Sequence, residues 1–330
     1  MIRQAENRLN NSTLRKIMSS SMPAAGTLTA LSNDLADAVA RVSQSVVAIH
    51  ARRRIPSSGL VWSDGIVVAA NHTITRDEDI SVTSPDGSSV TGTLVGRDPS
   101  TDIAVLRAGT TGRLPDRAGE DQVQVGRVVL AVGRPGAQAT ASLGIISAVA
   151  GEWRTWQGGR IDRFIRLDLS VYDGFSGSAL VDAGGKVLGL NSSGLSRASA
   201  LAIPVTTVER VVGELLKRGR IVRGYLGLAV QPVRLPEVMQ RELGLPGPMG
   251  LVIINLETGG PADKAGLLLG DIITGLDNQE ITDQADLLGF LASETVGTQI
   301  SLRIVRAGTL ETVRATVGER PSRKERGHDR

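Results

Sequence analysis

The sequence predicts a mainly β protein: two halves that form barrels or sandwiches, followed by a smaller sheet. Short segments rich in Val, Ile and Leu recur at intervals of about 8–12 residues, which is typical of all-β folds and not of βαβ units. Glycine is abundant, at 39 of 330 residues, and aromatic residues make up only 2%, so many tight turns are expected. The length predicts about two domains.

The first half begins with a short helix and continues as strands. Leu35 and Val39 share one face of a helix over Ser32–Val42. Turn sequences at 63–65 and 85–87, each ending in Asp-Gly, indicate hairpins. The expected strands are Val46–His50, Leu60–Trp62, Ile66–Ala70, Ile80–Thr83, Val90–Val95 and Ile103–Arg107.

The second half repeats this pattern and ends in a helix. Pro204 ends the last strand, apolar residues then recur at helical spacing from Val208 to Leu216, and Gly219 ends the helix. The expected strands are Val128–Val132, Leu143–Val149, Phe164–Leu169, Ala179–Val181, Val187–Asn191 and Leu201–Ile203.

Residues 221–317 differ in pattern and predict a small separate sheet with two helices. The helices are expected over Pro261–Ala265 and Asp283–Ser293. The expected strands are Tyr225–Val230, Gly250–Leu256, Asp271–Leu276, Gln299–Val305 and Glu311–Val317.

The composition excludes several kinds of site. The chain has no cysteine, so disulfides and thiol chemistry are excluded, and its three histidines argue against a multi-histidine zinc cluster. No cofactor and no metal are expected. The net charge of +3 is small, and much of the excess lies in Arg320–Arg330, which we interpret as a charged tail and not as a nucleic-acid-binding segment.

The N-terminal segment lacks a recognisable targeting signal. Residues 1–30 are polar and mixed, and their least polar part, Met22–Leu31, is interrupted by Pro23 and Gly26. This stretch is too short and too polar for a membrane-spanning helix or a signal-peptide core. A cytoplasmic protein without an integral membrane segment is therefore expected.

The run Asp173–Leu180 places a serine on a glycine-rich turn before an apolar strand. Gly174 lets the backbone turn its amides toward a reacting carbonyl, and Gly177 leaves room beside Ser176. This setting suits a nucleophilic hydroxyl, although a serine in such a run is also common in ordinary turns.

A histidine and an aspartate precede this serine. His72 directly follows the strand Ile66–Ala70, and Asp102 directly precedes the strand Ile103–Arg107. In a catalytic triad His72 would accept the proton of Ser176 and Asp102 would orient the imidazole. Each residue alone could be structural, but the joint occurrence of all three in this order favours nucleophilic catalysis.

These motifs resemble the HtrA (DegP-like) serine proteases over roughly residues 31–317. Similar segments are 57–72 around the histidine, 98–106 around the aspartate, 133–136 with 144–148, 168–180 around the nucleophile, and 202–204. The resemblance implies a chymotrypsin-like double β-barrel followed by a PDZ domain. It implies a flexible tail over 1–30, a protease domain over 31–218, a PDZ domain over 219–317 and a charged tail over 318–330.

The resemblance also implies a function and its site. The expected activity is that of an ATP-independent serine endopeptidase that cleaves unfolded or damaged proteins. The expected assembly is a homotrimer. His72, Asp102 and Ser176 would form the triad, and the backbone amides of Gly174 and Ser176 the oxyanion hole. The specificity pocket would comprise Ser170, Val171, Leu190, Asn191 and Ser192. No carboxylate occurs among these five, so small aliphatic side chains are expected there in preference to Lys or Arg.

The nucleophile segment departs from the family pattern Asn-Pro-Gly-Asn-Ser-Gly-Gly-Pro at two notable positions. Phe175 and Ser178 replace an asparagine and a glycine. Phe175 cannot form the ion pair that activates digestive relatives after clipping, so ordering of the loops Gly151–Arg163 and Ser192–Ala198 is the expected means of activation. The departures also leave an alternative open: a pseudoprotease or chaperone that binds peptides without cutting them.

The C-terminal region resembles an HtrA-type PDZ domain, which binds peptide C-termini. Tyr225, Leu226, Gly227 and Leu228 are similar to the carboxylate-binding loop of such domains. A peptide would add as a strand beside this segment and against a helix that carries Leu287, Leu288 and Leu291. The alternative is a small sheet that acts only as a spacer.

Overall fold

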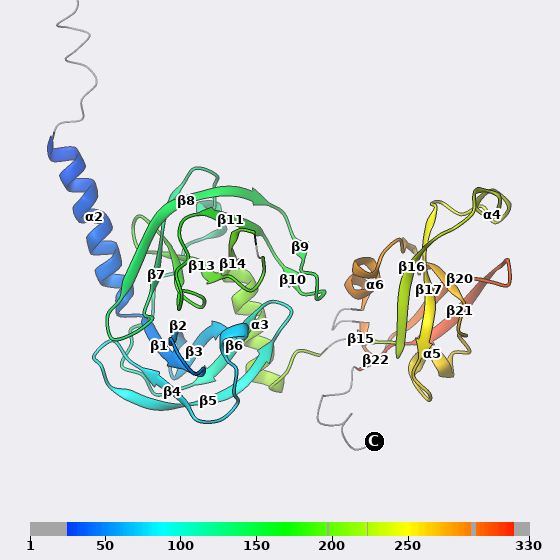
Figure 1. Cartoon of the computed structure of the whole chain (residues 1–330), viewed down its shortest axis with the longest axis horizontal. Helices are drawn as coiled ribbons and strands as arrows, with labels where there is room; N and C mark the ends of the chain where they lie inside the picture. The colour runs from blue at the N-terminus through cyan, green and yellow to red at the C-terminus, as the bar shows by residue number, and fades with distance from the viewer. Residues whose placement is uncertain (1–24, 197, 223, 292–294, 320–330) are drawn as a thin grey trace, which may run out of the picture.

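The computed structural model describes residues 25–319 except 197, 223 and 292–294. Two closed six-stranded barrels are followed by a separate domain built on an open sheet (Figure 1). The fold class predicted from the sequence, a chymotrypsin-like double barrel with a PDZ domain, is therefore confirmed.

The first barrel is antiparallel, with the strand order β1-β2-β3-β6-β5-β4. Alternate residues such as Val47, Ile49 and Val67 point inward and are fully buried. The strands are β1 (Val46–His50), β2 (Ser57–Ser63), β3 (Ile66–Ala70), β4 (Ile80–Thr83), β5 (Ser89–Asp98) and β6 (Ile103–Arg107).

The second barrel has the order β11-β14-β13-β12-β7-β8, and a small hairpin, β9–β10, follows β8. Trp153 of this hairpin packs edge-on against Phe164, with ring centroids 5.6 Å apart. The strands are β7 (Val128–Gly133), β8 (Thr140–Ala150), β9 (Trp153–Arg154), β10 (Arg160–Ile161), β11 (Phe164–Asp168), β12 (Ala179–Asp182), β13 (Val187–Ser192) and β14 (Ala200–Pro204).

Two α-helices flank the barrels. α2 (Ala25–Ser43) begins seven residues before the predicted helix start at Ser32, within the segment expected as a tail. Leu35 and Val39 pack against the barrel core, while the earlier turns project away from it (Figure 1). α3 (Val205–Arg218) ends as predicted at Gly219, whose left-handed conformation (φ 70°) lets its amide donate to the Leu215 carbonyl. Two short 3₁₀ helices are η1 (Asn71–Thr73) and η2 (Glu120–Gln122).

The PDZ domain is a sheet of order β16-β17-β18-β20-β21, with β19 beside β18. Its core is a separate cluster of buried Leu, Ile and Val side chains. The strands are β15 (Gly224–Tyr225), β16 (Leu228–Arg234), β17 (Met249–Leu256), β18 (Ile272–Leu276), β19 (Gln279–Glu280), β20 (Gln299–Arg306), β21 (Thr309–Thr316) and β22 (Gly318–Glu319), and the helices are α4 (Glu237–Glu242), α5 (Pro261–Lys264) and α6 (Gln284–Phe290).

Three details of this domain differ from the sequence expectation. The helix α4 was not predicted. Asp283 caps α6 and is not its first helical residue, while the predicted end at Ser293 lies outside the described residues. The strand Gly318–Glu319 pairs with Gly224–Tyr225, so regular structure continues past 317. Of the predicted flexible and charged tails, 1–24 and 320–330 also lie outside the described residues.

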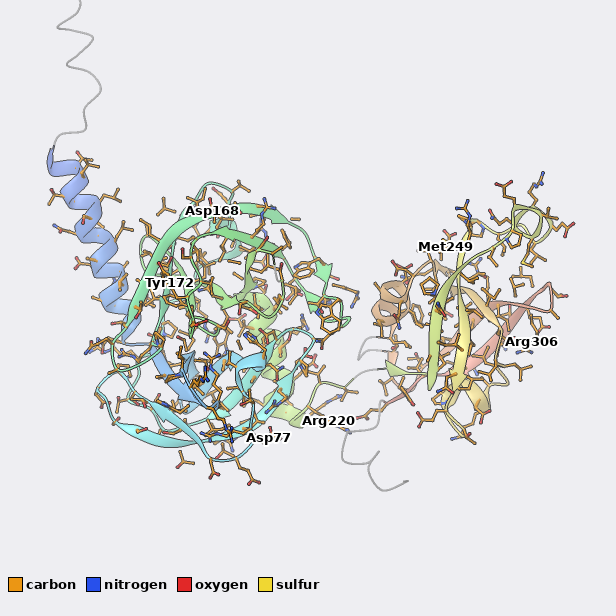
Figure 2. All side chains as sticks on the ribbon, in the orientation of Figure 1. Asp77, Asp168, Tyr172, Arg220, Met249 and Arg306 are labelled. Carbon is orange, nitrogen blue, oxygen red and sulfur yellow. The ribbon has the colours of Figure 1, made fainter. Side chains whose placement is uncertain are left out.

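A buried ion pair joins β20 to the turn before β18. The Arg306 guanidinium donates two hydrogen bonds to Asp271, at 2.8 and 2.7 Å, and Arg306 is labelled in Figure 2 at the end of the PDZ domain turned away from the barrels. Burial alone would raise the pKa of Asp271. The hydrogen bonds from Arg306 and from the Leu268 amide, together with the Arg306 charge, outweigh burial and hold this pKa below its ordinary value.

We expect Asp271→Asn to lower the unfolding free energy of the PDZ domain by about 3 kcal/mol at pH 7, because it leaves Arg306 without its buried partner. A depressed folded-state pKa stabilises the fold above the unfolded-state pKa near about 4 and ceases to do so as the pH falls below it. The difference between wild type and variant should therefore be full at neutral pH and shrink below about pH 4. Hydrogen exchange of β17 and β20 peptides measures it.

Glu311→Gln is the matched control, because Glu311 also pairs with Arg306, at 3.2 Å, but is 41% exposed. It should cost less than about 1 kcal/mol. Equal losses in the two variants would contradict the role assigned to Asp271.

Candidate active site

The turn after β3 positions His72. The Thr73 hydroxyl donates to the Ala70 carbonyl at 2.7 Å, which closes the 3₁₀ turn η1. The Asn71 amide donates to the Asp102 carbonyl at 2.9 Å, so the histidine turn is fixed directly to the aspartate segment. Thr73 therefore has a structural role beside the histidine.

Asp102 lies at the tight turn between β5 and β6. The Asp98 carboxylate organises this turn by accepting hydrogen bonds from the Ser100 amide and hydroxyl and from the Thr101 hydroxyl. Asp102 itself has a φ of 59°, in the left-handed region that few non-glycine residues adopt. Such strain is typical of functional positions that the surrounding structure holds in place.

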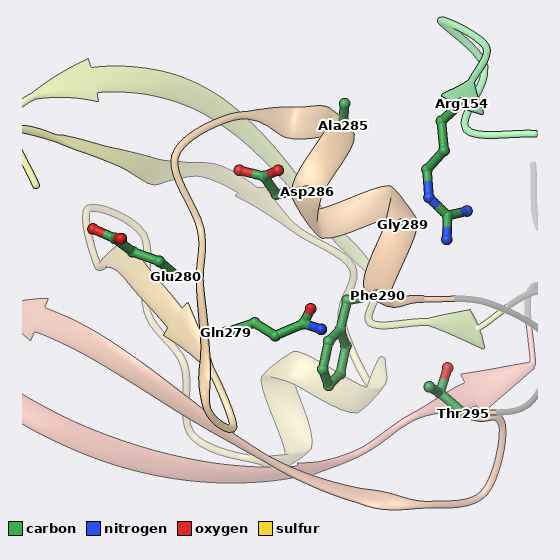
Figure 3. A pocket seen from close by; sticks show the side chains of 8 residues that line it. All are labelled: Arg154, Gln279, Glu280, Ala285, Asp286, Gly289, Phe290 and Thr295. Carbon is green, nitrogen blue, oxygen red and sulfur yellow. The ribbon is translucent and has the colours of Figure 1, made fainter. Parts of the chain in front are cut away.

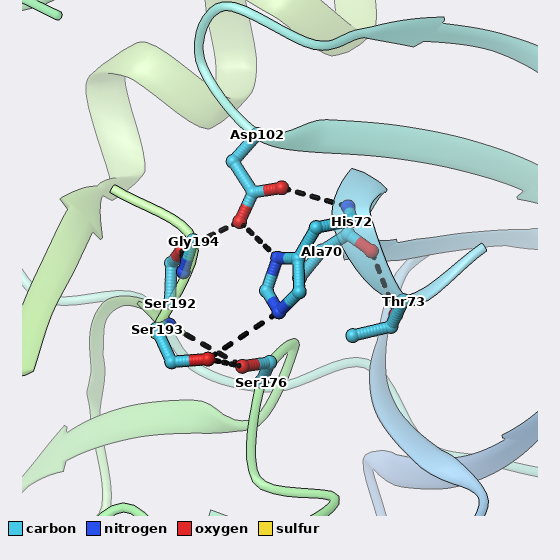
Figure 4. Close-up of polar contacts among 8 residues, drawn as sticks. All are labelled: Ala70, His72, Thr73, Asp102, Ser176, Ser192, Ser193 and Gly194. Carbon is cyan, nitrogen blue, oxygen red and sulfur yellow. Dashed lines mark hydrogen bonds and ion pairs between the residues drawn. The ribbon is translucent and has the colours of Figure 1, made fainter. Parts of the chain in front are cut away.

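The Asp102 carboxylate accepts three hydrogen bonds (Figure 4). They come from His72 Nδ1 at 2.8 Å, from the His72 amide at 2.8 Å and from the Ser192 hydroxyl at 2.5 Å. Because a carboxylate accepts hydrogen bonds, His72 Nδ1 must carry the ring proton and Nε2 must be the accepting nitrogen. The imidazole is thus oriented as a general base.

A glycine allows the loop after β13 to close over this pair. A Cβ at Gly194 would lie 2.6 Å from His72 Nδ1 and 2.8 Å from Asp102 Oδ2, closer than any real side chain sits. The Gly194 amide donates to the Ser192 hydroxyl at 3.0 Å. Sequence reasoning assigned Ser192 to the specificity pocket and missed its contact with Asp102; the only signal was the hydroxyl-rich run 191–194 after a buried strand.

The nucleophile turn lies between β11 and β12. Gly174 and Gly177 both have a φ of 88°, and a Cβ at Gly177 would lie 2.1 Å from the Ser58 carbonyl oxygen of the first barrel. The Gly174 carbonyl accepts hydrogen bonds from the Ser58 amide at 2.9 Å and hydroxyl at 2.7 Å. Within the described part of the chain the amides of Gly174 and Ser176 donate to no group, so both are available to an oxyanion.

The two departures from the family pattern are accommodated by packing. Phe175 is fully buried and makes an edge contact with Tyr172, with ring centroids 5.3 Å apart. The Ser178 hydroxyl accepts a hydrogen bond from the Asn191 amide group at 2.9 Å. Both side chains are thus fully buried, and each packs against or bonds a neighbour.

The structure brings Ser176 and His72 to one site, but a fourth residue joins them. The Ser176 and Ser193 hydroxyl oxygens are 2.8 Å apart, and the Ser193 oxygen is 3.3 Å from His72 Nε2 (Figure 4). Among the residues that the structure describes, Ser176 and His72 form no direct hydrogen bond. Sequence reasoning included Ser193 only within the loop Ser192–Ala198 and near the pocket, and it assigned Ser193 no part in the proton transfer.

The predicted specificity pocket is only partly accessible. Ser170 is exposed and Val171 half-buried. The Leu190 side chain belongs to the core, while Asn191 and Ser192 are fully buried and bonded to Ser178 and Asp102. The expectation that these last three residues line the pocket is therefore wrong for their side chains, because the barrel and the triad use them.

The predicted PDZ groove lies beside the edge strand β16. Gly227 has a φ of 75°, and the Leu226 and Gly227 carbonyls accept hydrogen bonds from Ala262 and Glu257 amides, which fixes the loop before β16. Leu226, Leu287 and Leu291 are buried in the domain core, Leu228 is half-buried, and the Tyr225 hydroxyl donates to Glu257. Because β16 is at the sheet edge, its outer side can accept a further strand.

Leu288 does not face this groove. A Cβ at Gly158, in the β9–β10 hairpin, would lie 3.0 Å from the Leu288 Cβ. Arg154 of the same hairpin reaches α6, where a Cβ at Gly289 would lie 2.8 Å from its Nε atom (Figure 3). Arg154 thus lines a pocket of about 660 Å³ whose other walls belong to the PDZ domain. The assignment of Leu288 to peptide binding is corrected: it contacts the protease hairpin.

The described residues contain neither a metal-ligand cluster nor a membrane-spanning helix. No three or more His, Asp or Glu side chains lie close enough together there to hold a metal ion. No helix in that part of the chain has both the length and the apolar character needed to span a bilayer.

Family models match two parts of the chain. Residues 57–190 match the trypsin-like peptidase domain, and residues 224–317 match the PDZ domain. The first range contains all three triad candidates, and the second contains the predicted peptide groove.

Known relatives correct the expected location. A protein named probable periplasmic serine endoprotease DegP-like, from Brucella suis biovar 1 (strain 1330), is 35% identical over 285 residues, which cover 83% of this chain and 55% of the relative. A protein of the same name from Rhizobium meliloti (strain 1021) is 33% identical over 280 residues, covering 82% and 55%. The chain thus spans about half the length of these relatives. Their periplasmic names overturn the cytoplasmic expectation, which rested only on the polar character of residues 1–30.

A solved structure agrees over almost its whole length. The HtrA-type protease AlgW with decapeptide is 30% identical, with a TM-score of 0.69, and the match covers 87% of this chain and 99% of that one. Together with the triad geometry and the edge groove, this match shows that the chain belongs to the HtrA family of serine proteases.

Proposed function

We propose that the protein is an ATP-independent serine endopeptidase that cleaves unfolded or damaged proteins through an acyl-enzyme. One observation carries the proposal. His72 is hydrogen-bonded to a buried carboxylate, its accepting nitrogen contacts the Ser193 hydroxyl, and the Ser193 hydroxyl contacts the Ser176 hydroxyl. The names of the relatives support the same activity.

The geometry supports each step of acyl transfer. Ser176 Oγ would attack the substrate carbonyl while its proton moves toward His72, and Asp102 would stabilise the imidazolium that forms. The amides of Gly174 and Ser176 would bind the oxyanion, and each donor would raise the rate about 10²–10³-fold. His72 would then protonate the leaving amine, and water would hydrolyse the acyl-enzyme by the same route.

The alternative, a peptide-binding protein without turnover, is not favoured. It depends on Phe175 and Ser178, but Phe175 is buried and the Ser178 hydroxyl accepts a hydrogen bond from Asn191. The amides needed for the oxyanion remain available.

We propose that peptide C-termini bind the PDZ domain beside β16 and regulate the protease. The supporting contacts form a continuous series: α6 meets the β9–β10 hairpin at Arg154, and the hairpin residue Thr155 donates to the Ser100 carbonyl at 2.8 Å. Ser100 belongs to the turn that positions Asp102. Movement of α6 on peptide binding would therefore act on the aspartate segment through Gly151–Arg163, one of the loops expected to control activation.

We further propose a homotrimer outside the cytoplasm, with domains at 31–218 and 219–317. Leu28 and Leu31 on α2 are 60% and 50% exposed, which suits contact with another copy. The two core clusters that share no residue support separate protease and PDZ domains.

Ser176→Ala should abolish cleavage of unfolded casein and labelling by a fluorophosphonate probe, because the acyl acceptor is removed. Probe labelling and casein digestion are followed on gels for both proteins. Ser199→Ala, which changes a serine outside the proposed triad, is the control. Binding of casein without labelling or cleavage in the wild type would support the peptide-binding alternative instead.

A peptide panel should be cut mainly after small aliphatic residues, at least about 10-fold in kcat/KM over Lys or Arg, because Ser170 and Val171 offer no carboxylate to a basic side chain. Mass spectrometry of the products gives the preference. Dominant cleavage after basic residues would refute this reading of the pocket.

Arg154→Ala should weaken the effect of a PDZ-binding peptide on the cleavage rate by about 5-fold or more while leaving peptide affinity within about 2-fold, because it removes the contact with α6 but lies outside the β16 edge. Fluorescence anisotropy measures binding and casein digestion measures the rate. An unchanged peptide effect would rule out this hairpin as the route.

A further inference from the structure

We propose that Ser193 is a catalytic residue: its hydroxyl relays the proton between Ser176 and His72. The inference deepens the proposed protease function and rests on it. It names a fourth side chain in the reacting series, at a position that neither the triad logic nor the nucleophile motif identifies.

The directions of the hydrogen bonds follow from the chemistry of the groups. Nδ1 of His72 donates to Asp102, so the neutral ring has Nε2 as an acceptor. The Ser193 hydroxyl, 3.3 Å away, must then donate to Nε2. A hydroxyl has a single proton, so Ser193 must accept at its other contact, and the donor at 2.8 Å is the Ser176 hydroxyl. All three protons in the series therefore point toward Asp102.

The position of Ser193 is fixed by its neighbours. Ser192 is bonded to the buried Asp102 carboxylate, and the Gly194 amide is bonded to Ser192. The Ser193 amide lies 3.3 Å from the Ser176 oxygen and donates to it. The backbone of Ser193, an exposed residue, is thus held between Ser176 and the residue that bonds Asp102, so little backbone reorganisation is needed when the proton moves.

The relay acts during formation of the acyl-enzyme, and every proton is accounted for. As the bond from Ser176 Oγ to the substrate carbonyl carbon forms, the Ser176 proton passes to Ser193 Oγ and the Ser193 proton passes to His72 Nε2. Ser193 ends with one proton, as it began, and His72 becomes an imidazolium. When the carbon–nitrogen bond breaks, the imidazolium proton moves to the leaving amine, and His72 returns to its neutral form.

Kinetics in mixtures of light and heavy water test the relay. For acylation of wild-type protein by a peptide ester, two protons in flight should give a curved dependence of kcat/KM on the deuterium fraction. Ser193→Ala should lower kcat/KM about 10–100-fold, the range expected for losing one positioned proton carrier, and give a linear dependence. Ser193→Thr, which keeps the hydroxyl, should restore the curvature and most of the rate.

Ser196→Ala is the matched control, since Ser196 lies in the same loop and its hydroxyl accepts hydrogen bonds from the loop amides of Ala198 and Ser199. It should leave the curvature unchanged. An unchanged or faster rate in Ser193→Ala, or a linear dependence in the wild type, would overturn the relay: a faster rate would identify Ser193 as a block between nucleophile and base.

A measurement without turnover separates this inference from the protease proposal. The chain has only three histidines, so the nitrogen-15 signals of His72 can be assigned directly. Loss of a hydrogen bond to Nε2 in Ser193→Ala should move that signal toward the value of an unbonded nitrogen. If the wild type neither labels nor cleaves, the protease proposal fails; if it does both while Ser193→Ala moves neither this signal nor the rate, only the relay fails.

Discussion

The buried carboxylate of Asp102 is the interaction on which the site depends. It accepts two hydrogen bonds from a histidine in the turn after β3 and one from a serine at the end of β13. The histidine belongs to one barrel and the serine to the other. A buried carboxylate without partners would be very costly, so the three donors fix the two barrels against each other at this point. Catalytic geometry and barrel docking therefore share one set of hydrogen bonds.

Two further contacts hold the barrels together. One needs a residue without a side chain, and the other needs a long side chain with several donors. Gly177 meets the Ser58 carbonyl where any side chain would clash. Arg134 of the second barrel donates hydrogen bonds to the carbonyls of Val46 in the first barrel and Ser43 at the end of α2. It also donates to the Ala137 carbonyl of its own barrel. Burial lowers the pKa of the Arg134 guanidinium below its ordinary value, and each of its three nitrogens donates to one carbonyl.

The sequence predicted most of the fold, and it identified three side chains that the structure brings to one site, for a physical reason. Strands show a local pattern of apolar residues, and Ser176, His72 and Asp102 each follow or precede such a strand. Ser193 could not be found in this way, because its role depends on how closely a loop of one barrel approaches the histidine of the other. Leu288 was instead given a role that it does not have. It follows the helical pattern of a groove residue, but it packs against the hairpin at Gly158.

The β9–β10 hairpin of the protease domain contacts the PDZ domain in the described structure, and its composition suits a role in coupling them. It touches α6 through Arg154 and Gly158 and touches the aspartate turn through Thr155. Gly159 meets Ser100 so closely that a Cβ there would lie 2.4 Å from the Ser100 carbonyl oxygen. A rigid, close contact at one end and a long flexible side chain at the other would let α6 move without breaking the hairpin. Because coupling between two binding sites is reciprocal, any peptide effect on substrate affinity through this route must have an equal counterpart, in which substrate binding changes peptide affinity at β16.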